Sequence, residues 1–134
     1  MLTPIMKEAI LLIDHGSRLM EANAQLEIMA EMLRQKRSDN PDDPDEANNP
    51  IVGWAHMELC APDIAAGFDY CVEKGAEAIV VFPYLLAAGR HVKESIPEHL
   101  AKAAAKYPHV AYRIVEPFGV HPLLAEIIGE RCGL

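Results

Sequence analysis

Histidine and carboxylate side chains follow three separate apolar runs of this 134-residue chain. His15, Glu58 and His91 each come shortly after a run with the length and continuity of a buried β-strand. Two neutral imidazoles and one carboxylate suit a borderline divalent ion such as Fe²⁺, Co²⁺, Ni²⁺ or Zn²⁺. No local spacing such as His-Glu-x-x-His joins the three, so the fold must bring them together.

Each of these residues also has a purely structural interpretation. His15 could be a turn residue whose ring hydrogen-bonds a backbone carbonyl, and Glu58 could sit at the positive N-terminal end of a helix. His91 stands between Gly-Arg and Val, a combination that an ordinary loop does not need, which favours a functional role. Asp14 is either a partner that orients His15 or a solvated carboxylate. His56 lies inside a strand and is expected to be a satisfied core histidine.

Four apolar runs predict the strands of the fold: Ala9–Ile13, Ile51–Met57, Ala78–Phe82 and Val110–Val115. Segments with helical spacing of apolar residues follow them, starting near Ser17, Ala61, Pro97 and Pro122. Strands that alternate with helices predict an α/β fold: a three-layer, flavodoxin-like lobe with a four-stranded parallel sheet and helices on both faces. The carboxyl ends of parallel strands share one edge, where such folds bind ligands.

Local signals refine these boundaries. Ser17 is expected to cap the first helix, which runs to about Arg37, and Gly75 to end the second in a left-handed conformation. Pro83 should stop strand pairing, because proline cannot donate to the ladder. Ser95 and Glu98 have capping-box spacing, which places His91 in a loop before a helix at Pro97. The buried side of the last helix is expected to carry Leu123, Leu124, Ile127 and Ile128.

Composition excludes several classes of protein. The length predicts one domain over residues 1–134, and the formal net charge of −8 argues against nucleic-acid binding. Ser38–Pro50 is acidic and proline-punctuated, which predicts a surface loop. Three unpaired, widely spaced cysteines indicate a reduced chain with buried thiols. With no apolar run of about 20 residues, the expected location is cytoplasmic and not in a membrane.

Other enzyme signatures are missing from the sequence. It has no Gly-x-Ser-x-Gly nucleophile elbow, no Walker loop and no Gly-x-Gly-x-x-Gly fingerprint. Asp14-His15-Gly16 superficially resembles the Arg-His-Gly of histidine phosphatases, but an aspartate in place of the arginine would repel phosphate. A phosphatase is therefore disfavoured.

Three segments resemble motifs of the CbiX/SirB family of sirohydrochlorin chelatases: His15–Arg18 (HGSR), Glu58–Pro62 (ELCAP) and Pro83–Pro97 (PYLLAAGRHVKESIP). The third motif is long and specific. The likeness runs from about Ala9 to the C-terminal helix, apart from the acidic loop. The chain departs from the pattern at Glu94-Ser95, where many relatives carry an acidic pair.

The resemblance implies a chelatase-like fold and a type II chelatase, which inserts a divalent metal into sirohydrochlorin without ATP or an organic cofactor. It implies that His15 and His91 bind the metal, and that Glu58 assists as ligand or proton acceptor. Co²⁺ and Fe²⁺ are the expected metals, for cobalamin or sirohaem biosynthesis. Ni²⁺ is a third choice, weakened because the acidic loop has no histidine. A non-catalytic carrier of metal or tetrapyrrole is the alternative function.

Further expectations follow from the same resemblance. Sirohydrochlorin carries many carboxylates, and Arg18, Arg90 and Lys93 border the proposed edge and could clamp them. Backbone amides near Gly16 and Ser17 could add to this binding at a helix N-terminus. Large family members have two lobes that face each other across a cleft, whereas short members pair as homodimers. A homodimer with two-fold symmetry is therefore expected here.

Overall fold

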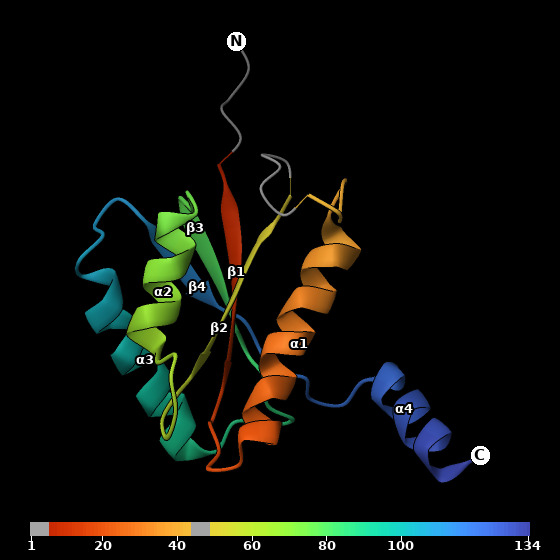
Figure 1. Cartoon of the computed structure of the whole chain (residues 1–134). Coiled ribbons are helices and arrows are strands. Elements are labelled where there is room, and N and C mark those ends of the chain that lie inside the picture. Colours follow the sequence, from red (N-terminus) through yellow and green to blue (C-terminus); the bar gives the residue numbers. More distant parts are fainter. Residues whose placement is uncertain (1–5, 44–48) are drawn as a thin grey trace.

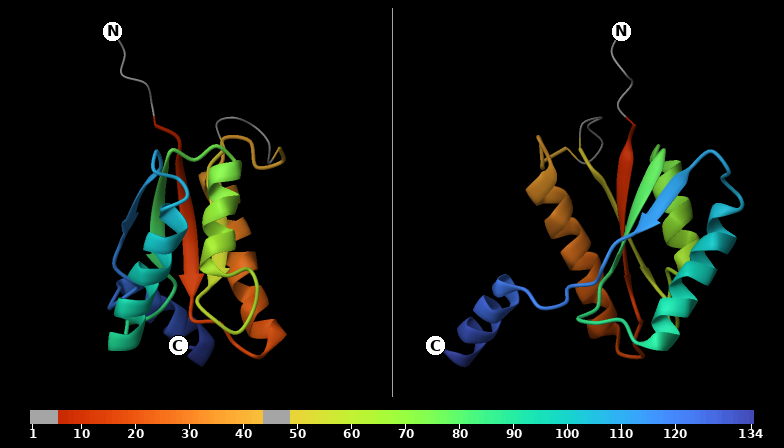
Figure 2. Two further views of the ribbon diagram at one scale, coloured as in Figure 1. Left: turned by 90° about the vertical axis from the view of Figure 1, so that its left-hand side faces the viewer. Right: turned by 180° about the vertical axis from the view of Figure 1, so that it is seen from behind.

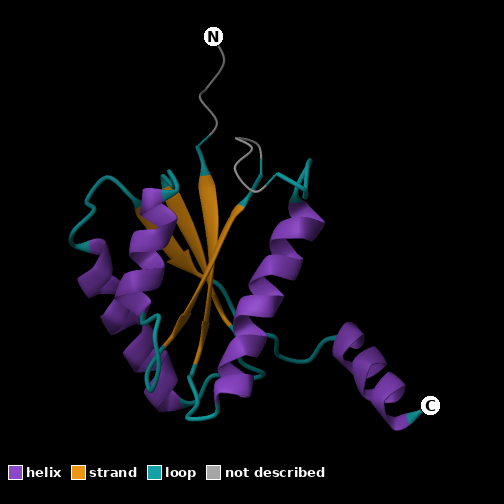
Figure 3. Ribbon diagram, in the orientation of Figure 1, coloured by secondary structure: helices purple, strands orange, loops and turns teal. Residues whose placement is uncertain are grey.

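The computed structural model describes residues 6–43 and 49–134. Strands and helices alternate along the chain, as predicted (Figure 3). The elements are β1 (Glu8–Asp14), α1 (Met20–Arg37), β2 (Ile51–His56), α2 (Ile64–Glu73), β3 (Ala78–Pro83), α3 (Arg90–Ala104), β4 (Ala111–Ile114) and α4 (Pro122–Cys132). Residues 44–48 of the predicted acidic loop lie outside the described residues.

The sheet has the strand order β2-β1-β3-β4, and its neighbouring strands are parallel. β1 is central because both of its edges are paired: Leu11 is in register with Gly53 of β2 and with Val81 of β3. This confirms the predicted α/β fold. All strands therefore end at one edge of the sheet, which is the lower edge in Figure 1.

Helices cover the sheet on both sides and make three layers (Figure 2). On one face, Phe68 of α2 and Leu100 of α3 are fully buried with Leu11 of β1 in the larger core. On the other face, Leu26 of α1 is buried with Leu12 and its neighbours. Burying each such side chain stabilises the fold by about 1.5–3 kcal/mol. β1 is apolar on both faces because it contributes to both cores.

The first helix does not begin as predicted. Leu19 is its N-cap and makes no side-chain cap hydrogen bond. The Ser17 hydroxyl instead accepts a hydrogen bond from the Leu19 N–H at 3.0 Å. The backbone of Ser17 is bound twice by Asn23, whose Oδ1 accepts from the Ser17 N–H at 2.9 Å and whose Nδ2 donates to the Ser17 carbonyl at 2.7 Å. Asn23 therefore stabilises the entry to α1 in place of the expected cap.

The prediction of a loop around His91 was wrong. α3 begins at Arg90 after the N-cap Gly89, so His91 lies in its first turn, and Pro97 lies inside the helix. The capping box at Ser95 is not used. Ile96, Leu100 and Ala103 are buried at helical spacing on both sides of the proline, and this packing outweighs the one hydrogen bond that Pro97 removes. β3 likewise runs to Pro83, one residue beyond its predicted end.

The last helix also differs from the prediction. α4 begins at Pro122, as expected, and its N-cap His121 accepts a hydrogen bond from the Leu123 N–H at 3.1 Å. α4 lies wholly within the described residues, however, and none of its side chains is buried. The helix projects away from the lobe beyond α1 (Figures 1 and 2). On the side that was expected to be buried, Leu123, Ile127 and Ile128 are exposed and Leu124 is half-buried in the single chain.

Candidate functional site

Backbone pairing between β1 and β2 continues past the ends of both strands. The Met57 N–H donates to the Asp14 carbonyl at 2.9 Å, and the Glu58 N–H donates to the His15 carbonyl at 3.2 Å. Two residues that are 43 positions apart in the sequence are thus fixed side by side at the carboxyl edge of the sheet. The predicted convergence of His15 and Glu58 is present in the structure.

The side chains of these two residues contact each other. Nε2 of His15 lies 3.2 Å from Oε1 of Glu58, and the side chains are 45% and 49% exposed. The other ring nitrogen, Nδ1, lies 3.4 Å from the Gly16 carbonyl oxygen. An imidazole nitrogen and a carboxylate at this separation, open to solvent, can share a proton or bind the same divalent ion.

Gly16 makes this close approach possible. Its φ of +93° lies in the left-handed region that favours glycine. A Cβ at this position would lie 1.9 Å from the Glu58 carbonyl oxygen. A side chain here would push apart the two segments that hold His15 and Glu58.

A contact between a buried histidine and a carboxylate lies directly behind the site. His56 is 2% exposed, and its Nδ1 is 2.6 Å from Oδ1 of Asp14. His56 is the satisfied core histidine that was expected, but its partner was not foreseen. Asp14 binds His56, in place of orienting His15 or being fully solvated. Because the side-chain direction alternates along a strand, Asp14 and His15 serve different partners.

Leu59 adds backbone strain next to Glu58. Its φ is +76°, an unusual conformation for a residue with a branched side chain, and the side chain is 56% exposed. The sequence gives no signal for this feature, because leucine rarely adopts such a conformation. Exposed apolar side chains also occur at Leu19 and Met20, where α1 begins, and at Leu86, in the loop after β3. These side chains could pack against the face of an apolar ring.

His91 lies at the same edge of the sheet, where α3 begins (Figure 1), and its side chain is exposed. Within the described residues, however, no group of three or more His, Cys, Asp or Glu is close enough to hold a metal ion. The structure therefore joins His15 to Glu58 and leaves His91 outside this contact. The three-residue metal site stays a prediction.

The predicted anion-binding side chains are all exposed, but they differ in the groups that lie near them. Arg18 follows the site directly and is exposed. The Arg90 side chain is 94% exposed, with Nε 3.5 Å from Oε1 of Glu94. Lys93 lines a cavity of about 360 Å³ between α3 and the end of β4, together with Glu116. The backbone N–H of Ser17, in contrast, is already bound to Asn23, so an anion would have to displace that side chain.

A smaller cavity opens beside His15. It has a volume of about 220 Å³ and is lined by His15, Asn23, Tyr84 and Leu85, among others. Tyr84 and Leu85 belong to the long motif Pro83–Pro97. One end of this motif therefore lies beside His15, and its other end forms the first turns of α3. The sequence motifs therefore surround one region of the carboxyl edge.

Comparison with known proteins gives consistent matches. The sequence model of the CbiX family matches residues 9–133. The chain is 38% identical over 124 residues to the chloroplastic sirohydrochlorin ferrochelatase of Arabidopsis thaliana. This match covers 92% of this chain and 51% of that protein. It is 31% identical over 122 residues to the sirohydrochlorin cobaltochelatase of Sulfolobus acidocaldarius, covering 91% of this chain and 87% of the relative. The chain thus spans about half the length of the ferrochelatase and most of the archaeal protein.

Solved structures agree with these sequence matches. The sirohydrochlorin chelatase SirB from Bacillus subtilis subspecies spizizenii, in complex with cobalt, superposes with a TM-score of 0.77 at 31% identity, over 96% of this chain and 50% of that chain. A putative cobalamin biosynthesis CbiX protein from Marinobacter aquaeolei superposes with a TM-score of 0.68 at 28% identity, over 94% of both chains. The motifs at the carboxyl edge, the fold and these matches lead to the same conclusion: the chain belongs to the CbiX family.

Proposed function

We propose that this chain is a sirohydrochlorin chelatase lobe, which inserts Co²⁺ or Fe²⁺ into the tetrapyrrole without ATP, for cobalamin or sirohaem biosynthesis. The observation that carries the proposal is the 3.2 Å contact between His15 Nε2 and Glu58 Oε1 at the carboxyl edge of the sheet. The relatives named as ferrochelatases and cobaltochelatases, and the cobalt complex of SirB, support it.

In this proposal the metal substrate binds first between His15 and Glu58. The imidazole nitrogen and the carboxylate oxygen suit both cobalt and iron. His91, at the start of α3, joins as a further ligand when the metal and the macrocycle are bound. The half-exposure of His15 and Glu58 leaves room for a ligand from outside the lobe.

Metal insertion also requires a base. Two pyrrole N–H protons leave the macrocycle as the ion enters, and a carboxylate within reach of the ring can accept one. Glu58 is suited to this role because its carboxylate is exposed and lies beside His15, the proposed metal ligand. His15 can act with it, because their polar atoms are within hydrogen-bonding distance.

The carboxylates of the macrocycle require cations at the rim. Arg18, Arg90 and Lys93 are exposed at the ends of the elements that hold the site, and we propose that they bind the substrate side chains. Leu59 and Leu86, which are 56% and 68% exposed, would contact the apolar ring face. A cleft that grips the macrocycle on both sides can distort it and expose its nitrogen lone pairs.

Such a cleft needs a second lobe, and we propose that a second copy of the chain supplies it in a homodimer. No nucleic acid is expected as a partner, because the net charge is −8. Among the described residues no helix has the length and apolar character to cross a bilayer. A cytoplasmic location remains part of the proposal.

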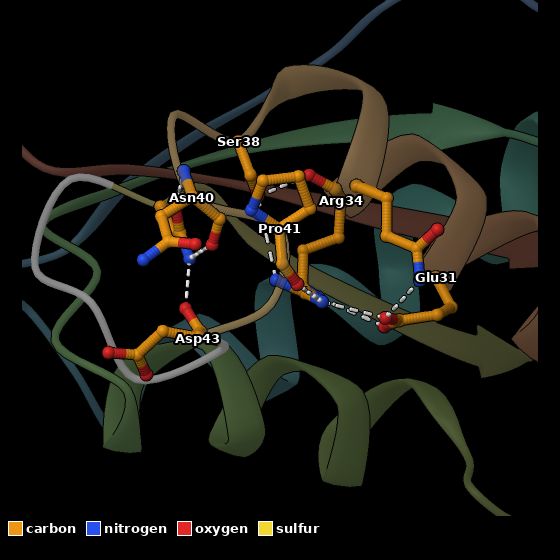
Figure 4. Close-up of polar contacts among 8 residues, drawn as sticks. Glu31, Arg34, Ser38, Asn40, Pro41 and Asp43 are labelled. Carbon is orange, nitrogen blue, oxygen red and sulfur yellow. Dashed lines mark hydrogen bonds and ion pairs between the residues drawn. The ribbon is translucent and has the colours of Figure 1, made fainter.

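The acidic loop is placed outside this mechanism. Its described ends are tied down at the amino end of the sheet (Figures 1 and 4). Arg34 binds both carboxylate oxygens of Glu31, at 2.7 and 3.0 Å, and donates to the Pro41 carbonyl at 3.2 Å. Buried Asn49 bonds to the backbone of Asn40 and donates to the Asp43 carbonyl. These contacts hold the described ends of the loop at the edge opposite to His15.

The test is anaerobic absorbance of the purified protein with sirohydrochlorin, with Co²⁺, Fe²⁺ and Ni²⁺ added in parallel against protein-free controls. The proposal expects spectral conversion faster than in the control with Co²⁺ or Fe²⁺. Fastest conversion with Ni²⁺ would show a nickel chelatase in its place. Binding of pigment or metal without acceleration for any ion would overturn catalysis and leave the carrier function.

A further inference from the structure

The turn that carries His15 is held from two sides. On the sheet side, the Glu58 N–H donates to the His15 carbonyl at 3.2 Å. On the helix side, Asn23 near the start of α1 bonds to both polar groups of the Ser17 backbone, at 2.9 and 2.7 Å. Gly16 is the single residue between these two anchor points. The conformation of the turn therefore depends on what fixes the backbone at Gly16.

Gly16 leaves the peptide group that follows it free to take more than one orientation. Its φ is +93°, and a residue without a Cβ adopts both signs of φ readily. The peptide group between Gly16 and Ser17 is planar, so its carbonyl and its N–H point in opposite directions. A hydrogen bond made by the Ser17 N–H therefore also sets the direction of the Gly16 carbonyl.

The two ends of this peptide group face Asn23 and His15. Oδ1 of Asn23 accepts from the Ser17 N–H at 2.9 Å, and the Gly16 carbonyl oxygen lies 3.4 Å from Nδ1 of His15. The bond from Nδ2 of Asn23 to the Ser17 carbonyl, at 2.7 Å, fixes which way the amide of Asn23 is turned. Because a carbonyl oxygen can only accept, a bond at the His15 end requires the ring proton on Nδ1. The position of Asn23 thus bears on which nitrogen of His15 carries the proton.

The tautomer of His15 matters for metal binding. With the proton on Nδ1, the lone pair of the neutral ring is on Nε2, which is the nitrogen 3.2 Å from Oε1 of Glu58. Histidines that bind metals commonly donate their other ring N–H to a backbone carbonyl or a carboxylate, which fixes the tautomer and the orientation of the ring. At 3.4 Å the bond to the Gly16 carbonyl is weak. It therefore depends on a carbonyl that is itself held in place.

We propose that Asn23 is a positioning residue of the metal site. It orients the peptide group between Gly16 and Ser17, and this group holds His15 with the Nε2 lone pair toward Glu58. Asn23 acts through the peptide group and is not itself a ligand, because both ends of its amide are bound to the turn. The inference rests on the proposed function and adds a residue to its site.

The first test reads the tautomer of His15 in the metal-free protein, by two-dimensional ¹H–¹⁵N NMR of the histidine rings at alkaline pH, where imidazole is neutral. His15→Gln identifies the His15 signals by their loss. The unaltered protein is expected to carry the proton on Nδ1, and Asn23→Ala to shift the population toward a proton on Nε2. A ring protonated on Nε2 in the unaltered protein would overturn the proposal, even where a variant fails to fold. So would a tautomer that is the same in Asn23→Ala.

The second test measures Co²⁺ affinity by titration calorimetry. Asn23→Asp keeps the acceptor for the Ser17 N–H but places a carboxylate oxygen against the Ser17 carbonyl. The affinity is expected to fall several-fold in Asn23→Asp and Asn23→Ala. This is less than the roughly 10–100-fold that loss of a direct partner of a metal ligand causes, because Asn23 acts through one peptide group. Unchanged affinity in both variants would overturn the proposal.

Two controls separate positioning from charge and from stability. Gln25→Glu adds the same charge to the wall of the same cavity and should not weaken Co²⁺ binding. Asn49→Asp repeats the substitution at the amino edge, where buried Asn49 bonds to the N–H and the carbonyl of Asn40 at 3.3 and 2.9 Å. It should lower the unfolding midpoint and leave the affinity unchanged. An equal loss of affinity in Asn49→Asp and Asn23→Asp would reveal a general effect of stability and overturn the positioning role.

These outcomes are distinct from those of the chelatase assay. Neither test uses the tetrapyrrole, so a failure of metal insertion would leave the result for Asn23 standing. A chain that binds no Co²⁺ would overturn the proposed metal site and the role of Asn23 in it together. A chain that binds Co²⁺ equally well in every variant would overturn the role of Asn23 alone.

Discussion

Oδ1 of Asp14 lies 2.6 Å from Nδ1 of the buried His56, and this contact joins β1 to β2 at their last residues. The next residue after Asp14 is His15, and Glu58 follows two positions after His56. The buried pair therefore stands directly behind the exposed pair. It fixes the ends of the two strands from which the site side chains extend.

His56 is accordingly expected to be a positioning residue for the site. His56→Ala should lower metal insertion by less than the roughly 10–100-fold that loss of a direct partner of a metal ligand causes, because His56 holds the strand ends and does not contact His15 or Glu58. His56→Gln keeps a polar group beside Asp14 and should recover part of the activity. The measurement is the insertion rate at several metal concentrations, together with the thermal midpoint of unfolding. If both variants lose stability equally and keep the wild-type rate, His56 has only a structural role.

His15 and Glu58 are expected to contact the metal and the macrocycle directly during insertion. His15→Ala should reduce both metal binding and insertion by more than about 100-fold, which exceeds the effect of an indirect partner. Glu58→Gln keeps the size and removes the charge, so it should reduce insertion more than metal binding if Glu58 is the base. Titration calorimetry with Co²⁺ and the absorbance assay distinguish these effects. His109→Ala, at an exposed position outside the site, is the control.

Gly16→Ala should destabilise the protein and separate His15 from Glu58. Its Cβ would lie 1.9 Å from the Glu58 carbonyl oxygen, in a backbone with a φ of +93°. A strained conformation of this kind costs about 1–3 kcal/mol before the steric clash is counted. Gly89→Ala is the matched control, because its φ is −70° and the space around its Cβ is open. Urea unfolding of both variants is the measurement, and equal midpoints would contradict this account of Gly16.

The three cysteines should react in a defined order. Burial raises the pKa of the Cys71 thiol to about 12, so almost none of it is the reactive thiolate at pH 8. Cys132 is exposed and Cys60 is partly exposed, so the prediction of buried thiols was wrong for these two. A thiol reagent at pH 8 should therefore label these two in the native protein, and Cys71 only after unfolding. Mass spectrometry after digestion checks the order, and rapid native labelling of Cys71 would contradict it.

Replacement of Asp39–Asn49 by a short glycine linker should leave metal insertion nearly unchanged. The described ends of this loop lie at the amino edge of the sheet, opposite to His15 (Figure 1). Stability should fall slightly, because the contact of Arg34 with the Pro41 carbonyl and the contacts of buried Asn49 are lost. The insertion rate and the unfolding midpoint are compared with those of the full chain. A large loss of rate at unchanged stability would show that the loop takes part, for example in metal delivery.

The sequence by itself determined the order of the elements and the edge that carries the site. Continuous apolar runs identify strands covered on both faces, as β1 is in the structure. Because parallel strands end at the same edge, the positions of His15, Glu58 and His91 follow from the order of the elements. These features depend on local pattern and on topology, both of which the sequence contains.

Only the tertiary structure decided which side chains meet. The pairing of Asp14 with His56 and of His15 with Glu58 depends on the register of β1 against β2, which no local pattern specifies. The start of α3 at Arg90 depends on burial of Ile96 and Leu100, which outweighs the local preference of Pro97. The exposure of α4 depends on hydrogen bonds that anchor Phe118 to the loop after β3. Each joins residues distant in sequence, so its energy appears only once the chain has folded.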